Sequence, residues 1–342
     1  MPSVELFPGI CDFHVHVGEK IGGYELRDDF SALDKLARRQ GLRAIGAFVT
    51  EEEGLSLPEK LRRMQDDARQ HFEGFVHWHL TPVSASVEDI HPLLEEGCDL
   101  KFYTTYKQAG IYKSYKEIGR WIEDLSQLKT RILLHCEDDS VIAQASAAHY
   151  FKTAMNHTLR RPELAETIAV ERVLDLAVRY DHPIHIVHVS TPGAALLIAE
   201  AKQHNPGITC ETAPHYLLYN ADLLKGPQGH RWLCTPPLRS EESRGLLVEL
   251  LQEGVFDIIA SDHCAFNPED KDRFKTDPAR VPCGLEGLQS LFPSLFERLV
   301  EPGSISLEAL VRLCCQRPAE LMGVANPPRY TLNQLLGREK HG

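Results

Sequence analysis

Two histidines separated by one residue lie in a short apolar stretch near the start of the chain, GICDFHVHVG, residues 9–18. In a β-strand, residues i and i+2 point to the same side, so His14 and His16 are expected to project together, with Asp12 on the same face. Two buried imidazoles are unfavourable unless hydrogen bonds or a divalent metal satisfy them. This stretch alone leaves both interpretations open, a hydrogen-bonded pair in the core or a metal site.

The same kind of apolar run recurs along the chain, and helical stretches separate the runs. The eight runs are residues 9–18, 44–50, 75–83, 99–103, 131–137, 184–190, 208–214 and 257–264. Eight strands that alternate with helices predict an α/β protein with the (β/α)8 TIM-barrel fold. The competing doubly wound sheet usually carries a GxGxxG turn after its first strand, and the turn HVHVGEKIGG does not match that pattern.

Functional side chains of such a barrel lie at the carboxyl ends of its strands. Beyond the first strand, these positions hold Lys101, His135, His188 and Asp262. Four imidazoles, a carboxylate and an amine at one mouth are hard to explain by packing, so a metal site is favoured over a core pair. An ammonium would repel cations, and the lysine makes sense if its amine has reacted with carbon dioxide to give a carbamate that bridges two of them.

The composition is that of an ordinary globular protein of 342 residues, with 43% hydrophobic and 25% charged residues. A net charge of −12 argues against non-specific binding to nucleic acid. The sequence contains neither a secretory leader nor an apolar run of about 18 residues, and its nine cysteines include no CxxC pair. We therefore expect a cytoplasmic protein with no membrane partner and one barrel domain over residues 1–342, with its core at about 9–323.

Seven short motifs carry a resemblance to a known family. They are DFHVHVG, LKFYTTYK, LLHCEDD, VHVS, ETAPHYL, TPPLR and SDHCAFN, in this order. Between about Cys11 and Pro318 the chain resembles the amidohydrolase superfamily, and more narrowly the cyclic amidohydrolases: dihydroorotases, hydantoinases (dihydropyrimidinases) and allantoinases. The resemblance implies hydrolysis of the C–N bond of a cyclic amide or imide, a small-molecule substrate, with two zinc ions per chain.

Carried over residue by residue, the resemblance implies a role for each candidate. His14, His16 and Asp262 would bind the more buried zinc, His135 and His188 the other, and carboxylated Lys101 and a hydroxide would bridge the two. Asp262 would also act as general base and then acid, and Tyr106 would donate to the developing oxyanion. A non-catalytic scaffold relative is the main alternative from another class, and the six intact ligand positions weigh against it.

Two departures from the family pattern affect assembly and specificity. The β-sandwich that usually accompanies the barrel is expected to be missing or vestigial, which leaves a homo-oligomer possible but open. Dihydroorotases carry a substrate-binding arginine two positions after HxH, where this chain has Gly18. A neutral cyclic amide or imide is therefore the expected substrate, unless Arg27 or Arg239 substitutes and the protein is a dihydroorotase proper.

Other polar residues have structural explanations at least as good as functional ones. A second HxH pair, His77 and His79, lies in the run 75–83, where the resemblance places no ligand, so a hydrogen-bonded role in the core or rim is expected. Glu137 either orients a ligand or begins the following helix. A long loop over residues 148–161 is expected to border the site.

Overall fold

The computed structural model describes residues 5–339. Its main sheet consists of β2 (Ile10–Val15), β5 (Leu42–Thr50), β6 (Phe75–Thr81), β7 (Asp99–Tyr103), β8 (Ile132–His135), β9 (Ile184–Ile186), β10 (Ile208–Thr212) and β11 (Ile258–Ile259). Neighbouring strands pair in this order and are parallel. Just past β11, His263 bridges to Val15, and His16 N donates to His263 O at 2.8 Å. The sheet thus closes almost completely, and the predicted TIM barrel is confirmed.

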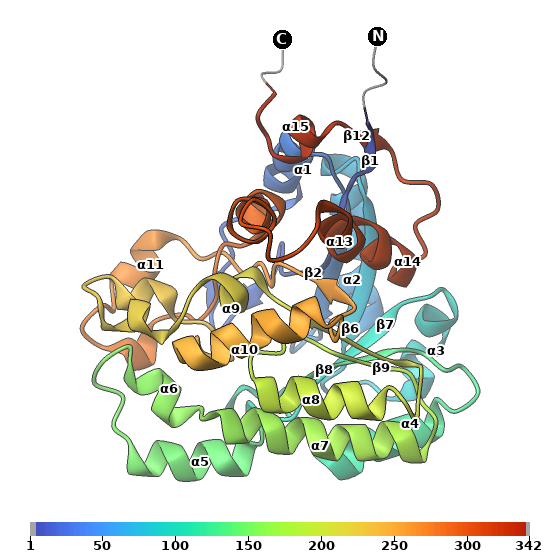
Figure 1. Cartoon of the computed structure of the whole chain (residues 1–342). Coiled ribbons are helices and arrows are strands. Elements are labelled where there is room, and N and C mark those ends of the chain that lie inside the picture. Colours follow the sequence, from blue (N-terminus) through green and yellow to red (C-terminus); the bar gives the residue numbers. More distant parts are fainter. Residues whose placement is uncertain (1–4, 340–342) are drawn as a thin grey trace.

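Helices cover the outside of the barrel (Figure 1). Each connection between successive strands contains at least one helix, in order α1 (Phe30–Gln40), α2 (Leu57–His71), α3 (Val87–Glu95), α4 (Tyr115–Asp124), α7 (Glu163–Arg179), α8 (Pro192–Ala201) and α10 (Glu241–Gln252). In Figure 1, α7, α8 and α10 lie side by side. After β11 the chain continues through α12 (Leu291–Leu295), α13 (Leu307–Val311) and α14 (Arg317–Leu321).

Local sequence signals explain where the helices begin and end. α1 begins after Asp29, whose carboxylate accepts the Ala32 backbone N–H at 2.8 Å, and it ends at Gly41, which has φ 67°. Ser114 and Glu117 form a reciprocal capping box at the start of α4. Each cap satisfies backbone groups that the helix itself leaves without a partner.

Two apolar layers hold the barrel together. The larger layer lies between strands and helices, and the smaller one fills the barrel interior. The interior layer includes Phe13, Phe48, Leu133, Val187 and Ile258, together with Ala319 and Met322 from the α14 region. α14 therefore packs under the barrel and closes its amino-terminal end, which leaves the carboxyl end for function.

The two chain ends meet outside the barrel. β1 (Phe7–Pro8) pairs antiparallel with β12 (Arg329–Tyr330), at the top of Figure 1. Within the part of the chain that the structure describes, these two strands are the sheet structure that the end segments contribute, and the short helix α15 (Leu332–Leu335) follows them. No helix among residues 5–339 combines the length and apolar character of a membrane span.

The structure differs from the sequence-based expectation at several boundaries. The expected loop 148–161 contains the short helix α6 (Asn156–Arg160), which follows α5 (Asp139–Ala148). β9 and β11 end earlier than the runs predicted, because the backbone turns into the left-handed region at His188 (φ 40°) and Asp262 (φ 51°). The regular strands thus stop where the candidate ligands begin.

Candidate metal centre

A β-bulge decides the direction of the first two candidate ligands. Relative to β5, β2 carries one extra residue between Asp12, opposite Ile45, and Val15, opposite Ala47. As a result, the adjacent residues Phe13 and His14 both point into the barrel, whereas Val15 lies in the outer apolar layer. Asp12 lies before the bulge and does not share the face of the two histidines, so that expectation is wrong.

The carboxylate of Asp12 instead ties two segments of the barrel together. Its Oδ1 accepts the backbone N–H of Ser261 at 3.0 Å and that of His14 at 3.1 Å. Asp12 therefore joins β2 to the segment after β11. Its role is structural, and it does not belong to the group of candidate ligands.

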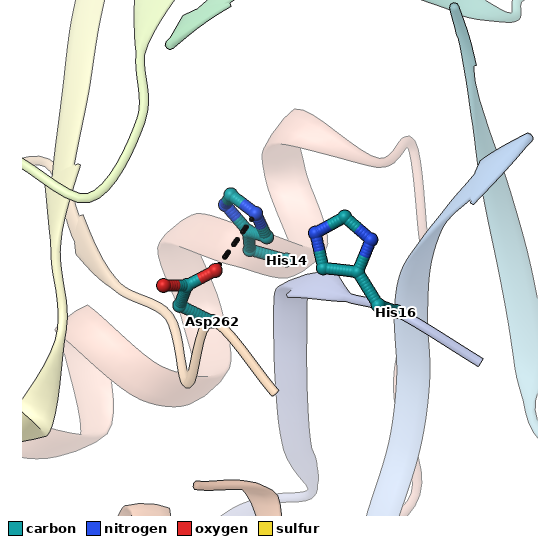
Figure 2. A group of neighbouring side chains, drawn as sticks. All are labelled: His14, His16 and Asp262. Atoms are coloured by element: carbon teal, nitrogen blue, oxygen red, sulfur yellow. Dashed lines mark ion pairs between the residues drawn. The ribbon is translucent and has the colours of Figure 1, made fainter. Parts of the chain in front are cut away.

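His14, His16 and Asp262 form a compact group (Figure 2). Their ligand atoms all lie within 4.8 Å of one another, and His14 Nε2 is 3.1 Å from Asp262 Oδ1. His16 Nδ1 is buried without a hydrogen bond, with Glu19 Oε2 3.8 Å away. Nitrogen and oxygen donors of this kind, close together and incompletely satisfied, are suited to a zinc ion.

The other three candidates complete the same mouth. The His188 ring lies with its centroid 5.4 Å from that of His14 and 4.6 Å from that of His135. The Lys101 ammonium lies 5.1 Å from the ring centre of Phe48, and its Nζ is buried with no hydrogen-bond partner. The structure therefore brings all six predicted residues together, and we name the set of His14, His16, Lys101, His135, His188 and Asp262 the mouth cluster.

Burial changes the protonation of the mouth cluster. It lowers the pKa of His14 and of His188 well below the usual histidine range, so both rings are neutral and offer a lone pair. Burial also lowers the pKa of Lys101 to about 8, so a larger share of its amine is uncharged and able to react with carbon dioxide. Burial, with Glu211 nearby, raises the pKa of Asp262. Cations would reverse this last shift, and the residues present fit zinc.

Glu211, on β10, orients two of the candidate ligands. It contacts His14 Nδ1 directly and accepts the His188 backbone N–H at 3.2 Å. Its second oxygen lies 3.1 Å from His185 Nε2. The contact at Nδ1 leaves His14 Nε2 facing Asp262. Metal-binding histidines commonly have this arrangement, in which a carboxylate contacts one ring nitrogen and the other nitrogen binds the metal.

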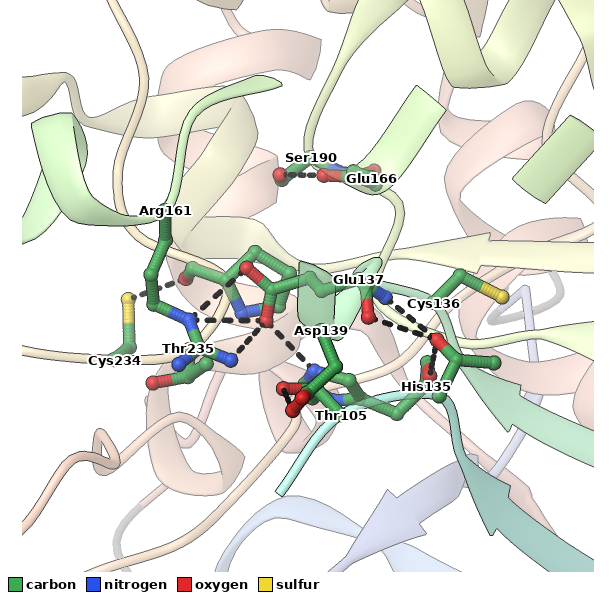
Figure 3. Close-up of polar contacts among 12 residues, drawn as sticks. Thr105, His135, Cys136, Glu137, Asp139, Arg161, Glu166, Ser190, Cys234 and Thr235 are labelled. Carbon is green, nitrogen blue, oxygen red and sulfur yellow. Dashed lines mark hydrogen bonds and ion pairs between the residues drawn. The ribbon is translucent and has the colours of Figure 1, made fainter. Parts of the chain in front are cut away.

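Glu137 orients a third candidate ligand, His135 (Figure 3). His135 Nε2 lies 2.8 Å from Glu137 Oε2, which leaves Nδ1 for the site, and Arg161 Nη2 donates to the same oxygen at 2.6 Å. Burial alone would raise the pKa of Glu137, but Arg161 and His135 hold it well below its usual range. Of the two interpretations of Glu137, the structure supports the orienting one.

Tyr106 lies at the rim of the mouth, beside this network. Its ring centroid is 5.2 Å from that of His135, and the Arg161 guanidinium lies 5.1 Å from its centre. Burial raises the pKa of the Tyr106 hydroxyl, so it stays protonated and able to donate at neutral pH. Its backbone has φ 69°, and a left-handed conformation at a residue with a Cβ is a feature of functional loops.

The two arginines considered as partners of a substrate carboxylate are already paired. Arg27 donates to Asp28 at 2.8 Å and to Glu286 at 2.6 Å. Arg239 is buried and donates to Glu166 at 3.1 Å. Neither guanidinium is free to bind a ligand without first breaking an ion pair.

The second histidine pair lies deeper in the barrel. His77 Nε2 is 2.8 Å from Asp99 Oδ2, and Arg131 Nη1 donates to that oxygen at 3.0 Å. His79 Nε2 donates to the Phe13 carbonyl at 3.0 Å, whereas its Nδ1 lies 3.6 Å from Asp99. We name His77, His79, Asp99 and Arg131 the floor cluster. Its members are joined by hydrogen bonds and ion pairs; His79 and Asp99 are buried, whereas His77 and Arg131 are partly exposed.

Sequence reasoning missed Glu211 and Arg161. Glu211 precedes the carboxyl end of β10 by one residue, on the inward face, and an inventory of inward polar residues on every strand would have found it. Arg161 follows a short helix in the long loop. It is far from Glu137 along the chain, so no sequence pattern indicates that the two residues are in contact.

Comparisons with known proteins agree with this geometry, although no family model matches the chain. The chain is 28% identical to the dihydroorotase of Brevibacillus brevis over 322 residues, which cover 91% of this chain and 72% of the relative. It is 27% identical to the dihydroorotase of Bacillus cereus, with 93% and 73% covered.

Solved structures show the same fold. The dihydropyrimidinase of Brevibacillus agri superposes with a TM-score of 0.86 at 27% identity, covering 94% of this chain and 72% of the other. The D-hydantoinase of Bacillus sp. AR9 gives 0.86 at 26% identity, with 92% and 71% covered. Relatives by sequence and neighbours by structure both fall in the cyclic amidohydrolase group, so the predicted resemblance to that group is confirmed.

Proposed function

We propose that the mouth cluster binds two zinc ions and that the protein hydrolyses the C–N bond of a small cyclic amide or imide, with residues 1–342 forming one catalytic domain. The observation that carries the proposal is the convergence of four imidazoles, a carboxylate and a lysine on one mouth, with His16 Nδ1, His188 Nδ1 and Lys101 Nζ left without hydrogen bonds. Buried polar atoms are normally paired, so three unpaired ones in a single site favour a bound cation.

The ligands divide between two ions. His14, His16 and Asp262 would hold one zinc, His135 and His188 the other, and carboxylated Lys101 would bridge them. When bound, the zinc pair would polarise the amide carbonyl and make a hydroxide available at neutral pH.

Two side chains of this protein would act on the reacting atoms. Asp262, facing His14 Nε2 at 3.1 Å, would accept a proton from the attacking water and return it to the departing ring nitrogen. Tyr106, held protonated by burial beside Arg161, would donate to the oxygen that gains negative charge in the transition state.

The substrate is proposed to be neutral. Gly18 stands where a dihydroorotase would carry an arginine, and Arg27 and Arg239 are engaged by carboxylates of the protein itself. Arg161, the arginine next to Tyr106, is likewise paired, with Glu137. A carboxylate buried without a cation would lose several kcal/mol of hydration free energy, roughly 2–7 for a polar group and more for a charge. A dihydropyrimidine or hydantoin avoids this penalty.

Two measurements test the proposal. Metal analysis of the purified protein is expected to find two zinc ions per chain, and a protein without zinc would favour the non-catalytic scaffold. Values of kcat/KM on dihydrouracil, hydantoin and dihydroorotate then define the substrate. A preference for dihydroorotate would make the protein a dihydroorotase like its named relatives and would show that one of the paired arginines is released by the substrate. Light scattering of the same sample shows whether the protein is a monomer or a homo-oligomer.

A further inference from the structure

The orientation of His14 depends on an irregularity in its strand. Cys11 and Phe13 point into the barrel, so an unbroken alternation would turn His14 outwards and Val15 inwards. The extra residue of the bulge between Asp12 and Val15 reverses the alternation. Without the bulge, the HxH pair would face the helices and could not take part in the mouth cluster.

One edge of the bulged segment is held by backbone hydrogen bonds. His263, the residue after Asp262, donates its N–H to His14 O at 3.3 Å and accepts from His16 N at 2.8 Å. These bonds join β2 to the segment that carries Asp262, so they fix the two parts of the mouth cluster relative to each other.

A side chain contacts the bulge from inside the barrel. His79 Nε2 donates to the carbonyl of Phe13, the residue before His14, at 3.0 Å, and the ring is fully buried. Gly46 lies on the strand between them, and a Cβ at this position would clash with both Phe13 O and His79 Nε2. The close approach of the three strands here therefore requires glycine.

The remainder of the floor cluster lies beside the other ring nitrogen of His79, Nδ1, which has no hydrogen-bond partner. Asp99 lies 3.6 Å from His79 Nδ1, and Asp99 is itself held by His77 at 2.8 Å and by Arg131 at 3.0 Å. Although His77, His79 and Asp99 are close enough to hold an ion, the Arg131 guanidinium already balances the charge of Asp99, and a dication beside it would be repelled.

We propose that His79 is a positioning residue for the metal centre: by donating to the Phe13 carbonyl, it holds the β2 bulge that turns His14 towards the zinc. This inference rests on the proposed function, since it requires that His14 binds metal. It gives the floor cluster a role in metal binding, although none of its members belongs to the mouth cluster.

Zinc affinity of the full-length protein tests the proposal. His79→Leu, which lacks the donor, is expected to bind zinc about 10- to 100-fold more weakly, the usual loss when a group that orients a ligand is removed. His79→Gln keeps an N–H donor at a similar distance along the side chain and should recover most of the affinity. The affinity is measured by competition with a chromogenic chelator, independently of turnover.

His182 offers a matched control. It is also a buried histidine that donates from Nε2 to a backbone carbonyl, that of Thr130 at 2.9 Å, but it lies away from the mouth cluster. His182→Leu should lose thermal stability and keep parental zinc affinity. Parental affinity in His79→Leu, or an equal loss in both variants, would overturn the proposal.

A measurement on the parent protein covers the case in which His79→Leu does not fold. Long-range ¹H–¹⁵N spectra of histidine-labelled protein should show His79 as the neutral Nε2–H tautomer, with and without zinc. A proton on Nδ1 alone, or a third zinc per chain bound through the His79 ring, would overturn the inference. If the parent binds no zinc at all, the proposed function fails; if the parent binds two and His79→Leu binds them equally well, only this inference fails.

Discussion

The mouth and floor clusters contain the same sequence pattern with different surroundings. Each has two histidines at i and i+2 on one strand and an aspartate from another segment, and in each the three ligand atoms lie within 4.8 Å of one another. Each also contains a buried imidazole nitrogen without a hydrogen bond, His16 Nδ1 in the mouth and His79 Nδ1 in the floor. Among residues 5–339, Asp262 forms no ion pair with an arginine, whereas Asp99 is paired with Arg131. An HxH pair therefore specifies a shared face, and the neighbouring charges decide whether it suits a cation.

The cationic residue of each cluster makes this difference sharper. Arg131 keeps its charge at any physiological pH, so the floor is balanced without an ion. Lys101 has a pKa that burial lowers to about 8, and carbamate formation would convert it from a cation into an anion. The mouth would then gain a negative charge on modification and attract the zinc that the floor repels.

Exchanging the aspartate of each cluster for asparagine should give the largest contrast. Asp262→Asn is expected to lower kcat by about 10³-fold or more, because an amide cannot take up the proton that a general base must accept. Asp99→Asn should keep kcat within about tenfold of the parent but lower the free energy of unfolding by about 2 kcal/mol, because Arg131 loses its buried partner charge. Steady-state kinetics and urea unfolding measure the two effects.

The reverse result would break the comparison. If Asp99→Asn abolished turnover at unchanged zinc content, or if Asp262→Asn kept it, the division into a metal-binding mouth and a structural floor would be wrong.

Replacement of the mouth lysine is expected to remove bound metal. Lys101→Ala should lose zinc and lower kcat by about 10³-fold, equivalent to about 4 kcal/mol of transition-state stabilisation. A short carboxylic acid added to the variant should restore part of both, because it supplies the missing oxygens. Zinc content after dialysis is measured beside activity, and a variant with full zinc occupancy and parental rate would exclude the bridging role of Lys101.

A smaller effect is expected for the tyrosine at the rim. Tyr106→Phe should lower kcat by about 10²-fold and change KM little, because its hydroxyl would act mainly in the transition state. Tyr103→Phe serves as the control, since Tyr103 lies beside Tyr106 with ring centroids 5.8 Å apart. Equal kinetics of the two variants would assign Tyr106 no role of its own.

The sequence predicted the strands and the mouth cluster because both depend on short-range patterns. Apolar runs at regular intervals identify parallel strands, and polar residues at their carboxyl ends must converge once the barrel closes. The direction of His14 was predicted for an incomplete reason: alternation pairs it with His16, but only the bulge turns both inwards. One extra residue changes neither the composition of the strand nor the apolar pattern along it, so the bulge cannot be predicted from the sequence.

Long-range polar partners were beyond sequence reasoning for a different reason. Arg161 and Glu137 are separated by the helices α5 and α6 and the loop between them, and Arg27 is paired with Glu286 from the other end of the chain. Arginines in loops look available in a sequence, and the fold decides which carboxylate each one meets. The sequence alone therefore does not show that Arg27 and Arg239 are both engaged by carboxylates of the protein.

The pH dependence of stability gives the smallest effect and isolates the floor. Burial lowers the pKa of His79 from 6.5 to about 4, so between these values the unfolded chain binds a proton at this position that the folded protein does not. The contribution of His79 to stability is thus complete above pH 6.5 and is lost as the pH falls towards 4. One proton corresponds to a slope of about 1.4 kcal/mol per pH unit.

In zinc-free protein, where metal release cannot contribute, His79→Gln should show a shallower decline in the free energy of unfolding between pH 6.5 and 4, by up to that slope. Urea unfolding at pH 4.5, 5.5, 6.5 and 7.5 measures the decline in parent and variant. Parallel curves would show that His79 is protonated in the folded protein over this range, so that the floor cluster would carry the positive charge of an imidazolium.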